Sequence, residues 1–133
     1  MSEQHPNIVL LSQLDLGNLD ASADLFSEQF VWHYFNPNLP EVEGDYVGVA
    51  GLTDFFAKLG AETSGTFKVN PISATPIGEE LVVVHVRNSM ELDGEAIAID
   101  AAVVWRFVDG KIAEAWDIPS VHTLATSSAD GVR

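Results

Sequence analysis

The last third of the chain constrains the fold most, because two Asp-Gly pairs separate three apolar, β-branched runs. An Asp-Gly pair between such runs predicts a tight hairpin, since its residues adopt the positive φ angles that a two-residue turn needs. A two-residue loop at Asp93-Gly94 pairs Leu92 with Glu95 and places Arg87 opposite Asp100. The sequence therefore predicts an antiparallel sheet with the strands Glu80–Leu92, Glu95–Val108 and Lys111–Ile118.

This register gives the first two strands one charged face and one apolar face, because side chains alternate along a strand. The charged face carries His85, Arg87, Asp100 and Arg106. The opposite face is apolar apart from one amide and one indole, and it carries Val82, Val84, Val86, Asn88, Ile99, Ala101, Val103 and Trp105.

The face on which Asp117 lies depends on the second turn. A two-residue loop, Asp109-Gly110, places Asp117 opposite Ala102 on the charged face. A three-residue loop that begins at Val108, a type I turn followed by a left-handed glycine, places it opposite Ala101 on the apolar face. A slip of one residue moves every later side chain to the other face, so the pattern alone leaves both arrangements open.

The first half of the chain predicts helices. Apolar residues at helical spacing indicate a helix over Ile8–Leu16 that ends at Gly17, and a second helix that Asn18 caps and that runs to Glu28. The clearest amphipathic helix follows later, where Gly60 is expected to end the periodic series Leu52, Phe55, Phe56 and Leu59.

Two further strands and a loop complete the expected order. Phe30–Phe35 is aromatic and β-branched, Asn36–Asp45 is rich in loop residues, and Thr66–Thr75 contains Pro71, which indicates an edge strand or a bulge. Helices that precede a long sheet predict the α+β class. We expect one domain over residues 1–133, with loose tails at 1–6 and 123–133.

Charge and composition exclude several functions. A net charge of −14 on 133 residues opposes binding to nucleic acids and to anionic membranes. No apolar run approaches the ~20 residues that a membrane span needs. The absence of cysteine excludes disulfides and thiolate chemistry and favours a cytoplasmic protein. The sequence contains no phosphate-binding loop, dinucleotide glycine pattern or metal-ligand spacing, so we expect no cofactor and no metal.

Three segments together resemble a known family. GNLDASADLFSEQFVWHYF, GDYVGVAGLTDFFAKL and VVWRFVDGKIAEAWDI resemble, in order and spacing over Ile8 to His122, the SnoaL-like branch of the nuclear-transport-factor-2-like superfamily. The resemblance implies a cone: a strongly curved antiparallel or mixed sheet, wrapped by N-terminal helices, with an apolar pocket inside. It also implies a homodimer that forms through the outer face of the sheet.

The same resemblance implies where the functional residues lie. Asp117 matches the aspartate that transfers protons in SnoaL-like polyketide cyclases, which favours the three-residue turn. The predicted ligand contacts are Trp32, Tyr34, Asn36, Phe55, Val86, Asn88, Ala101, Val103 and Trp105. The predicted dimer contacts are His85, Arg87, Asp100 and Trp116. The donor residues of ketosteroid isomerases are missing, because Leu10 and Val103 stand at their positions, and so is the Arg-Asp pair of limonene epoxide hydrolases.

These residues predict a function for Asp117. An apolar pocket solvates the ionised carboxylate poorly, which raises its pKa towards the range of a general base. We therefore expect binding of a small apolar molecule and cofactor-independent proton transfer of the cyclase, isomerase or hydrolase type. The alternative is a dimeric ligand-binding or interaction domain without chemistry. His33 should point away from the pocket and be structural, whereas His122 lies either near the pocket mouth or in the tail.

Overall fold

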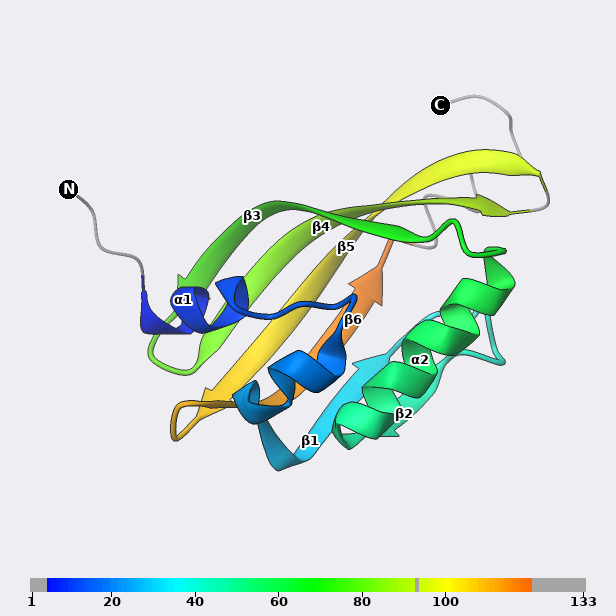
Figure 1. Cartoon of the computed structure of the whole chain (residues 1–133). Coiled ribbons are helices and arrows are strands. Elements are labelled where there is room, and N and C mark those ends of the chain that lie inside the picture. The colour runs from blue at the N-terminus through cyan, green and yellow to red at the C-terminus, as the bar shows by residue number, and fades with distance from the viewer. Residues whose placement is uncertain (1–4, 93, 121–133) are drawn as a thin grey trace.

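The fold is α+β, with helices beside one six-stranded mixed sheet (Figure 1). A computed structural model describes residues 5–92 and 94–120. The helical elements are α1 (Pro6–Ser12), the 3-10 helix η1 (Leu19–Leu25) and α2 (Gly48–Glu62). The strands are β1 (Phe26–Tyr34), β2 (Gly44–Val47), β3 (Lys68–Ile77), β4 (Leu81–Leu92), β5 (Glu95–Val108) and β6 (Lys111–Pro119).

The sheet has the strand order β2-β1-β6-β5-β4-β3. Strand β1 runs parallel to β6, and every other neighbouring pair is antiparallel. Helix α2 packs against β1 and β2, and α1 lies against β3 and β4 near the opposite edge. In the part of the chain that the structure describes, no helix is both long enough and apolar enough to cross a membrane.

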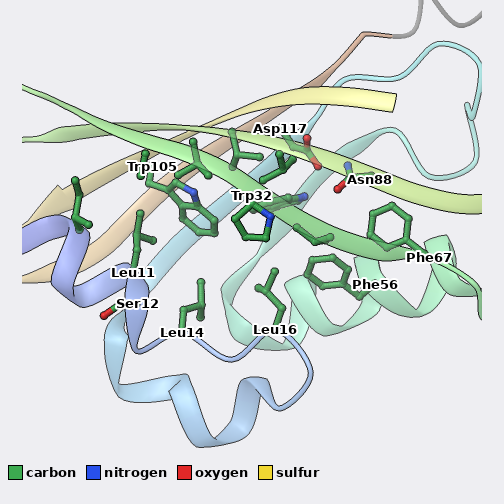
Figure 2. Close-up of a pocket in the computed structure, with 17 residues that line it drawn as sticks. Leu11, Ser12, Leu14, Leu16, Trp32, Phe56, Phe67, Asn88, Trp105 and Asp117 are labelled. Atoms are coloured by element: carbon green, nitrogen blue, oxygen red, sulfur yellow. The ribbon is translucent and has the colours of Figure 1, made fainter. Parts of the chain in front are cut away.

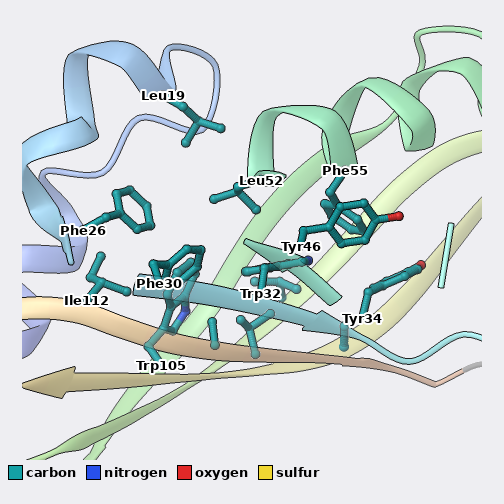
Figure 3. Packing of buried hydrophobic residues seen from close by; sticks show 14 of the residues in the cluster. Leu19, Phe26, Phe30, Trp32, Tyr34, Tyr46, Leu52, Phe55, Trp105 and Ile112 are labelled. Carbon is teal, nitrogen blue, oxygen red and sulfur yellow. The ribbon is translucent and has the colours of Figure 1, made fainter. Parts of the chain in front are cut away.

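The hydrophobic core lies between the helices and the inner face of the sheet (Figure 3). Leu92 pairs with Glu95 and Arg87 with Asp100, which confirms the predicted register of β4 and β5. The predicted apolar face of these strands is the inner one, where Val82, Val86, Ala101, Val103 and Trp105 are buried. Burial of one alternating face is what holds this register in place.

The inner face also receives Asp117, by a route that the sequence did not predict. The turn has two residues, Asp109 and Gly110, with φ angles of 52° and 78°, so the predicted three-residue turn is wrong. Val108 pairs with Lys111, but beyond a bulge Arg106 pairs with Glu114. The extra residue, Ala113, shifts the register by one, and Asp117 pairs with Val103. The predicted face is therefore confirmed, and its cause is the bulge.

The N-terminal helices are shorter than predicted. Helix α1 ends at Ser12, whose hydroxyl donates to the Val9 carbonyl at 2.6 Å, so the expected extension to Leu16 is wrong. Asn18 caps η1 as expected, because its Oδ1 accepts from the Ala21 N–H at 3.3 Å. The second helix is a 3-10 helix that stops at Leu25, because the aromatic and β-branched residues that follow pair with β6 as part of β1.

Strand β2, the end of α2 and strand β3 also differ from or match the expected elements. Strand β2 begins inside the expected loop, and Gly60 lies within α2 rather than ending it. The helix ends where Ser64 has a φ of 53° and the Gly65 N–H donates to the Gly60 carbonyl at 2.8 Å. Strand β3 is an edge strand with a register shift just after Pro71, which confirms both readings of that proline.

Two glycines of α2 provide a matched test of how closely this helix packs on β2. A Cβ at Gly51 would lie 2.9 Å from the carbonyl carbon of Tyr46, whereas a Cβ at Gly60 would meet nothing within 4 Å. We expect Gly51→Ala to destabilise the protein by about 1–3 kcal/mol, since it overpacks a contact with backbone. We expect Gly60→Ala to stabilise it by about 0.5–1 kcal/mol through helix propensity. Urea unfolding measures both, and changes of equal sign would contradict the close contact.

Candidate functional site

An apolar cavity of about 320 Å³ lies between the inner face of the sheet and the helical layer (Figure 2). Its volume is at the lower end of the range for small-molecule pockets. Side chains come from α1 and the segment after it, from α2 and from all strands except β2. The lining residues are Ile8, Leu11, Ser12, Leu14, Leu16, Trp32, Phe56, Phe67, Val69, Pro71, Ala74, Val84, Val86, Asn88, Val103, Trp105 and Asp117.

Asp117 is the one titratable residue among these lining residues. Its side chain is buried, with 8% of the residue exposed, and its Oδ1 atom has no hydrogen-bond partner among the described residues. Burial raises the pKa of this carboxyl from 3.8 to about 7, because the ionised form loses its hydration. A carboxyl with this pKa can accept or return a proton near neutral pH, which suits a general base or acid.

Two further polar side chains face the same cavity without a partner. Trp32 and Asn88 are buried, and Trp32 Nε1 and Asn88 Oδ1 form no hydrogen bond within the described part of the chain. The Trp32 ring packs against Trp105, with ring centroids 5.5 Å apart, and against Phe55 at 5.3 Å. Aromatic packing thus fixes the indole, and its buried N–H has no hydrogen-bond partner among the described residues.

The sequence model of a protein family, the SnoaL-like domain, matches residues 10–115 of this chain. The chain belongs to the SnoaL-like family. No curated protein sequence matches this SnoaL-like domain significantly.

Solved structures show that the domain shares the cone fold of nuclear-transport-factor-2-like proteins. It is similar to TerC, crystallised with polyporic acid, at 19% identity, over 91% of this chain and 96% of TerC, with a TM-score of 0.74. A candidate SnoaL-like polyketide cyclase from Jannaschia sp. CCS1 is 14% identical over 95% of each chain, with a TM-score of 0.73. An NTF2-like protein from Burkholderia thailandensis E264 is 19% identical over 96% of this chain and 98% of its own, with a TM-score of 0.74.

The cavity of this SnoaL-like domain brings together some of the predicted ligand contacts. Trp32, Val86, Asn88, Val103 and Trp105 line it beside Asp117. The other four predicted contacts, Tyr34, Asn36, Phe55 and Ala101, are buried outside this lining, and their part in ligand binding stays a prediction.

These four residues belong to the packed interior. The Tyr34 ring meets the edge of the Phe55 ring at 4.7 Å, and its hydroxyl accepts from Asn36 Nδ2 at 2.8 Å. Burial raises the pKa of Tyr34 to about 12, although the hydrogen bond from Asn36 opposes the shift and the nearby Asp117 adds to it. Ala101 and Phe55 are members of the hydrophobic core.

Sequence reasoning missed the other wall of the cavity. Leu11, Leu14 and Leu16 close it from the N-terminal segment, and Phe56 and Phe67 close it from α2 and the loop before β3. The helical spacing of Ile8, Leu11 and Leu14 signalled a buried face, but it did not show what that face covers.

The predicted dimer contacts lie on the outer face of the sheet, away from the cavity. Asp100 Oδ1 is 2.8 Å from His85 Nε2 and accepts from Arg87 Nε at 3.1 Å. Hydrogen bonds with His85 and then Arg87 lower the pKa of Asp100. Trp116 lies on this face as well, with Arg106 above its ring at 5.0 Å. The four residues are therefore placed where an interface would need them, and dimerisation itself stays a prediction.

His33 also lies on the outer face, as predicted. Its Nδ1 is 2.8 Å from Asp45 Oδ1, its Nε2 is 2.7 Å from Glu114 Oε2, and its ring stacks on Trp116 at 5.5 Å. Burial alone would lower the pKa of His33. The hydrogen bonds with Asp45 and Glu114 favour the charged ring more strongly, so the net pKa is raised. The side chain links β2, β1 and β6 and takes no part in the cavity. His122 lies outside the described residues.

Proposed function

We propose that this SnoaL-like domain binds a small apolar carbonyl compound and transfers a proton with Asp117 as general base. The observation that carries the proposal is a buried carboxylate, with a pKa of about 7, in the wall of an otherwise apolar cavity. Buried titratable groups in a pocket are typical of acid–base sites. The cavity volume of about 320 Å³ suits a ligand of one to a few rings.

The chemistry follows from the acidity of a C–H bond next to a carbonyl. The ionised Asp117 takes that proton, the C–H electron pair forms a carbon–carbon double bond, and the carbonyl π electrons move to oxygen as an enolate. In a ligand with a carbon–carbon double bond conjugated to the enolate, return of the proton to the far end of that double bond shifts the double bond and completes an isomerisation. Attack of the enolate carbon on a second carbonyl of the same molecule closes a ring. Asp117 is regenerated when its proton passes to the product.

The structural relatives support a ligand in the cavity. TerC was crystallised with polyporic acid, and the Jannaschia protein is a candidate polyketide cyclase. Identities of 19% and 14% reflect a shared fold, so the reaction is argued from Asp117 and not from these proteins.

Hydrogen–deuterium exchange tests the proposal. The probe is 2-tetralone, an apolar two-ring ketone with acidic C1 protons, whose exchange in D₂O is followed by proton NMR. Tryptophan fluorescence reports binding, because Trp32 and Trp105 line the cavity. We expect the wild type to accelerate exchange above the buffer rate. Asp117→Asn should slow it by about 100-fold or more, while the dissociation constant changes only severalfold.

The two remaining outcomes distinguish the alternatives. Wild-type exchange activity in Asp117→Asn would contradict the general-base role of Asp117. Binding of 2-tetralone without exchange by the wild type would favour a binding protein without chemistry. One observation supports that second function: Asp117 has no titratable partner among the described residues that line the cavity.

We also propose a homodimer through the outer face that carries His85, Arg87, Asp100 and Trp116. The exposed Ile118, next to this cluster on β6, adds apolar surface for such a contact. The molar mass in solution, measured by light scattering, tests it. A monomer at micromolar concentrations would contradict it.

A further inference from the structure

Three residues of the cavity lining each carry a buried polar atom that no protein group satisfies within residues 5–92 and 94–120: Trp32 Nε1, Asn88 Oδ1 and Asp117 Oδ1. The three residues are 3%, 7% and 8% exposed. Buried donors and acceptors are nearly always paired in folded proteins, so three unpaired atoms in one apolar cavity require a reason. A bound molecule with complementary polar atoms supplies one.

The three atoms differ in what they can bind. The two side-chain oxygens of Asn88 and the ionised Asp117 accept hydrogen bonds, whereas an indole N–H can only donate. The oxygen of a carbonyl compound needs a donor, and it needs a stronger one when it becomes an enolate oxygen. Because Asp117 must be ionised to take the proton, it cannot supply that donor in the same step.

We propose that Trp32 Nε1–H donates to the carbonyl oxygen of the ligand and stabilises the enolate that forms when Asp117 takes the proton. This inference rests on the proposed function and adds the residue that recognises the carbonyl group. It makes Trp32 a catalytic residue, and it makes a hydrogen-bond acceptor beside the acidic C–H a requirement for the substrate.

The position of Trp32 fits this role. Trp32 pairs with Ala115 across the parallel strands β1 and β6, and Asp117 follows Ala115 by two residues, so both side chains point to the inner face. In the view of Figure 2, Trp32, Asn88 and Asp117 lie on the same side of the cavity, away from Leu11. A ligand could thus meet the indole donor and the carboxylate together.

The aromatic neighbours hold the indole in place before any ligand binds. The Trp32 ring contacts Phe55, Phe56 and Trp105, with centroid distances of 5.3, 6.2 and 5.5 Å. A donor that is already oriented costs no reorganisation when charge develops on the oxygen, which is how such donors accelerate reactions. A buried strand position therefore serves the purpose better than a surface loop.

The test compares two ligands that differ in one carbonyl group: 2-tetralone and tetralin, the parent hydrocarbon. For each protein we take the ratio of the dissociation constant for tetralin to that for 2-tetralone. Trp32→Phe should lower this ratio about tenfold, which is the effect expected from one hydrogen bond to a buried donor. It should also slow C1 exchange of bound 2-tetralone about 100-fold.

Trp105→Phe is the matched control, because it removes a second indole from the same cavity wall. It should change the affinities for both ligands alike and leave the ratio within about twofold. Asn88→Leu tests the competing donor, since the amide nitrogen of Asn88 could also reach a carbonyl. The inference would be overturned if Trp32→Phe left the ratio of dissociation constants unchanged. It would also be overturned if Asn88→Leu lowered this ratio and Trp32→Phe did not.

A measurement on the wild type covers the case in which Trp32→Phe does not fold. The Trp32 indole N–H resonance is assigned by elimination, using Trp105→Phe and Trp116→Phe. It should move downfield with 2-tetralone and stay in place with tetralin, and no difference between the two ligands would overturn the inference. Exchange that depends on Asp117 without any effect of Trp32 leaves the proposed function standing. If Trp32→Phe changes the affinity ratio but the wild type does not accelerate C1 exchange, Trp32 still recognises the carbonyl group and the general-base role of Asp117 is contradicted.

Discussion

Asp117→Asn is expected to stabilise the folded protein above pH 7 by up to about 4 kcal/mol, the free energy that corresponds to a carboxyl pKa raised from 3.8 to about 7. Burial is the cause, because the folded protein must hold an ionised carboxylate that the unfolded chain hydrates freely. Asparagine keeps the shape of the side chain and removes the charge. A carboxylate retained at this cost is typical of a functional site, where activity opposes stability.

The pH dependence of the free energy of unfolding shows whether burial of the Asp117 carboxylate is the cause. Below pH 4 the carboxyl is protonated in both states and contributes no difference. Between pH 4 and 7 the unfolded chain has lost this proton while the folded protein keeps it, so the free energy of unfolding of the wild type falls as pH rises. Above pH 7 both states are ionised, and the full destabilisation remains.

Urea unfolding of the wild type and Asp117→Asn at pH 4, 6 and 8 measures this effect. The gain in stability should grow from pH 4 to pH 8. Asp54→Asn, at an exposed position of α2, controls for the loss of one negative charge from an acidic protein. A gain that is independent of pH would mean that the Asp117 carboxylate is hydrated or paired in the folded protein.

Phe55→Ala is expected to cost about 3–5 kcal/mol of folding free energy, because it empties a fully buried site at the centre of the aromatic core. The Phe55 ring lies 4.7 Å from the ring of Tyr34, 5.3 Å from Trp32 and 5.4 Å from Tyr46 (Figure 3). These contacts join α2 to β1 and β2, so the helix loses its main anchor on the sheet.

Phe35→Ala is the matched control, since the Phe35 residue is 57% exposed and follows directly after β1. Its free energy of unfolding should stay within about 0.5 kcal/mol of the wild type. Chemical denaturation of both variants tests the pair. Similar losses in the two variants would mean that Phe55 does not carry the packing of α2.

Much of the fold follows from the sequence by itself. The Asp93-Gly94 pair and a strict alternation of side chains specify the hairpin of β4 and β5, because one inner face must be buried and a slip would expose it. The same alternation assigns Val86, Asn88, Val103 and Trp105 to the cavity side. Signals of this kind depend on residues close together in the chain, and they are therefore visible in the sequence alone.

The tertiary structure decided what local signals could not. Ile112 and Asp117 are five residues apart, an odd spacing that would place them on opposite faces of a regular strand, yet both are buried. The bulge at Ala113 reconciles them, and it forms where β6 pairs with both β5 and β1. The cavity likewise depends on Leu11, Leu14 and Leu16 meeting strands β3, β4 and β5, which lie far along the chain from them. The bulge in β6, which belongs to the pairing of strands and not to any local sequence signal, thus places Asp117, the one carboxylate among the described lining residues, on the inner face.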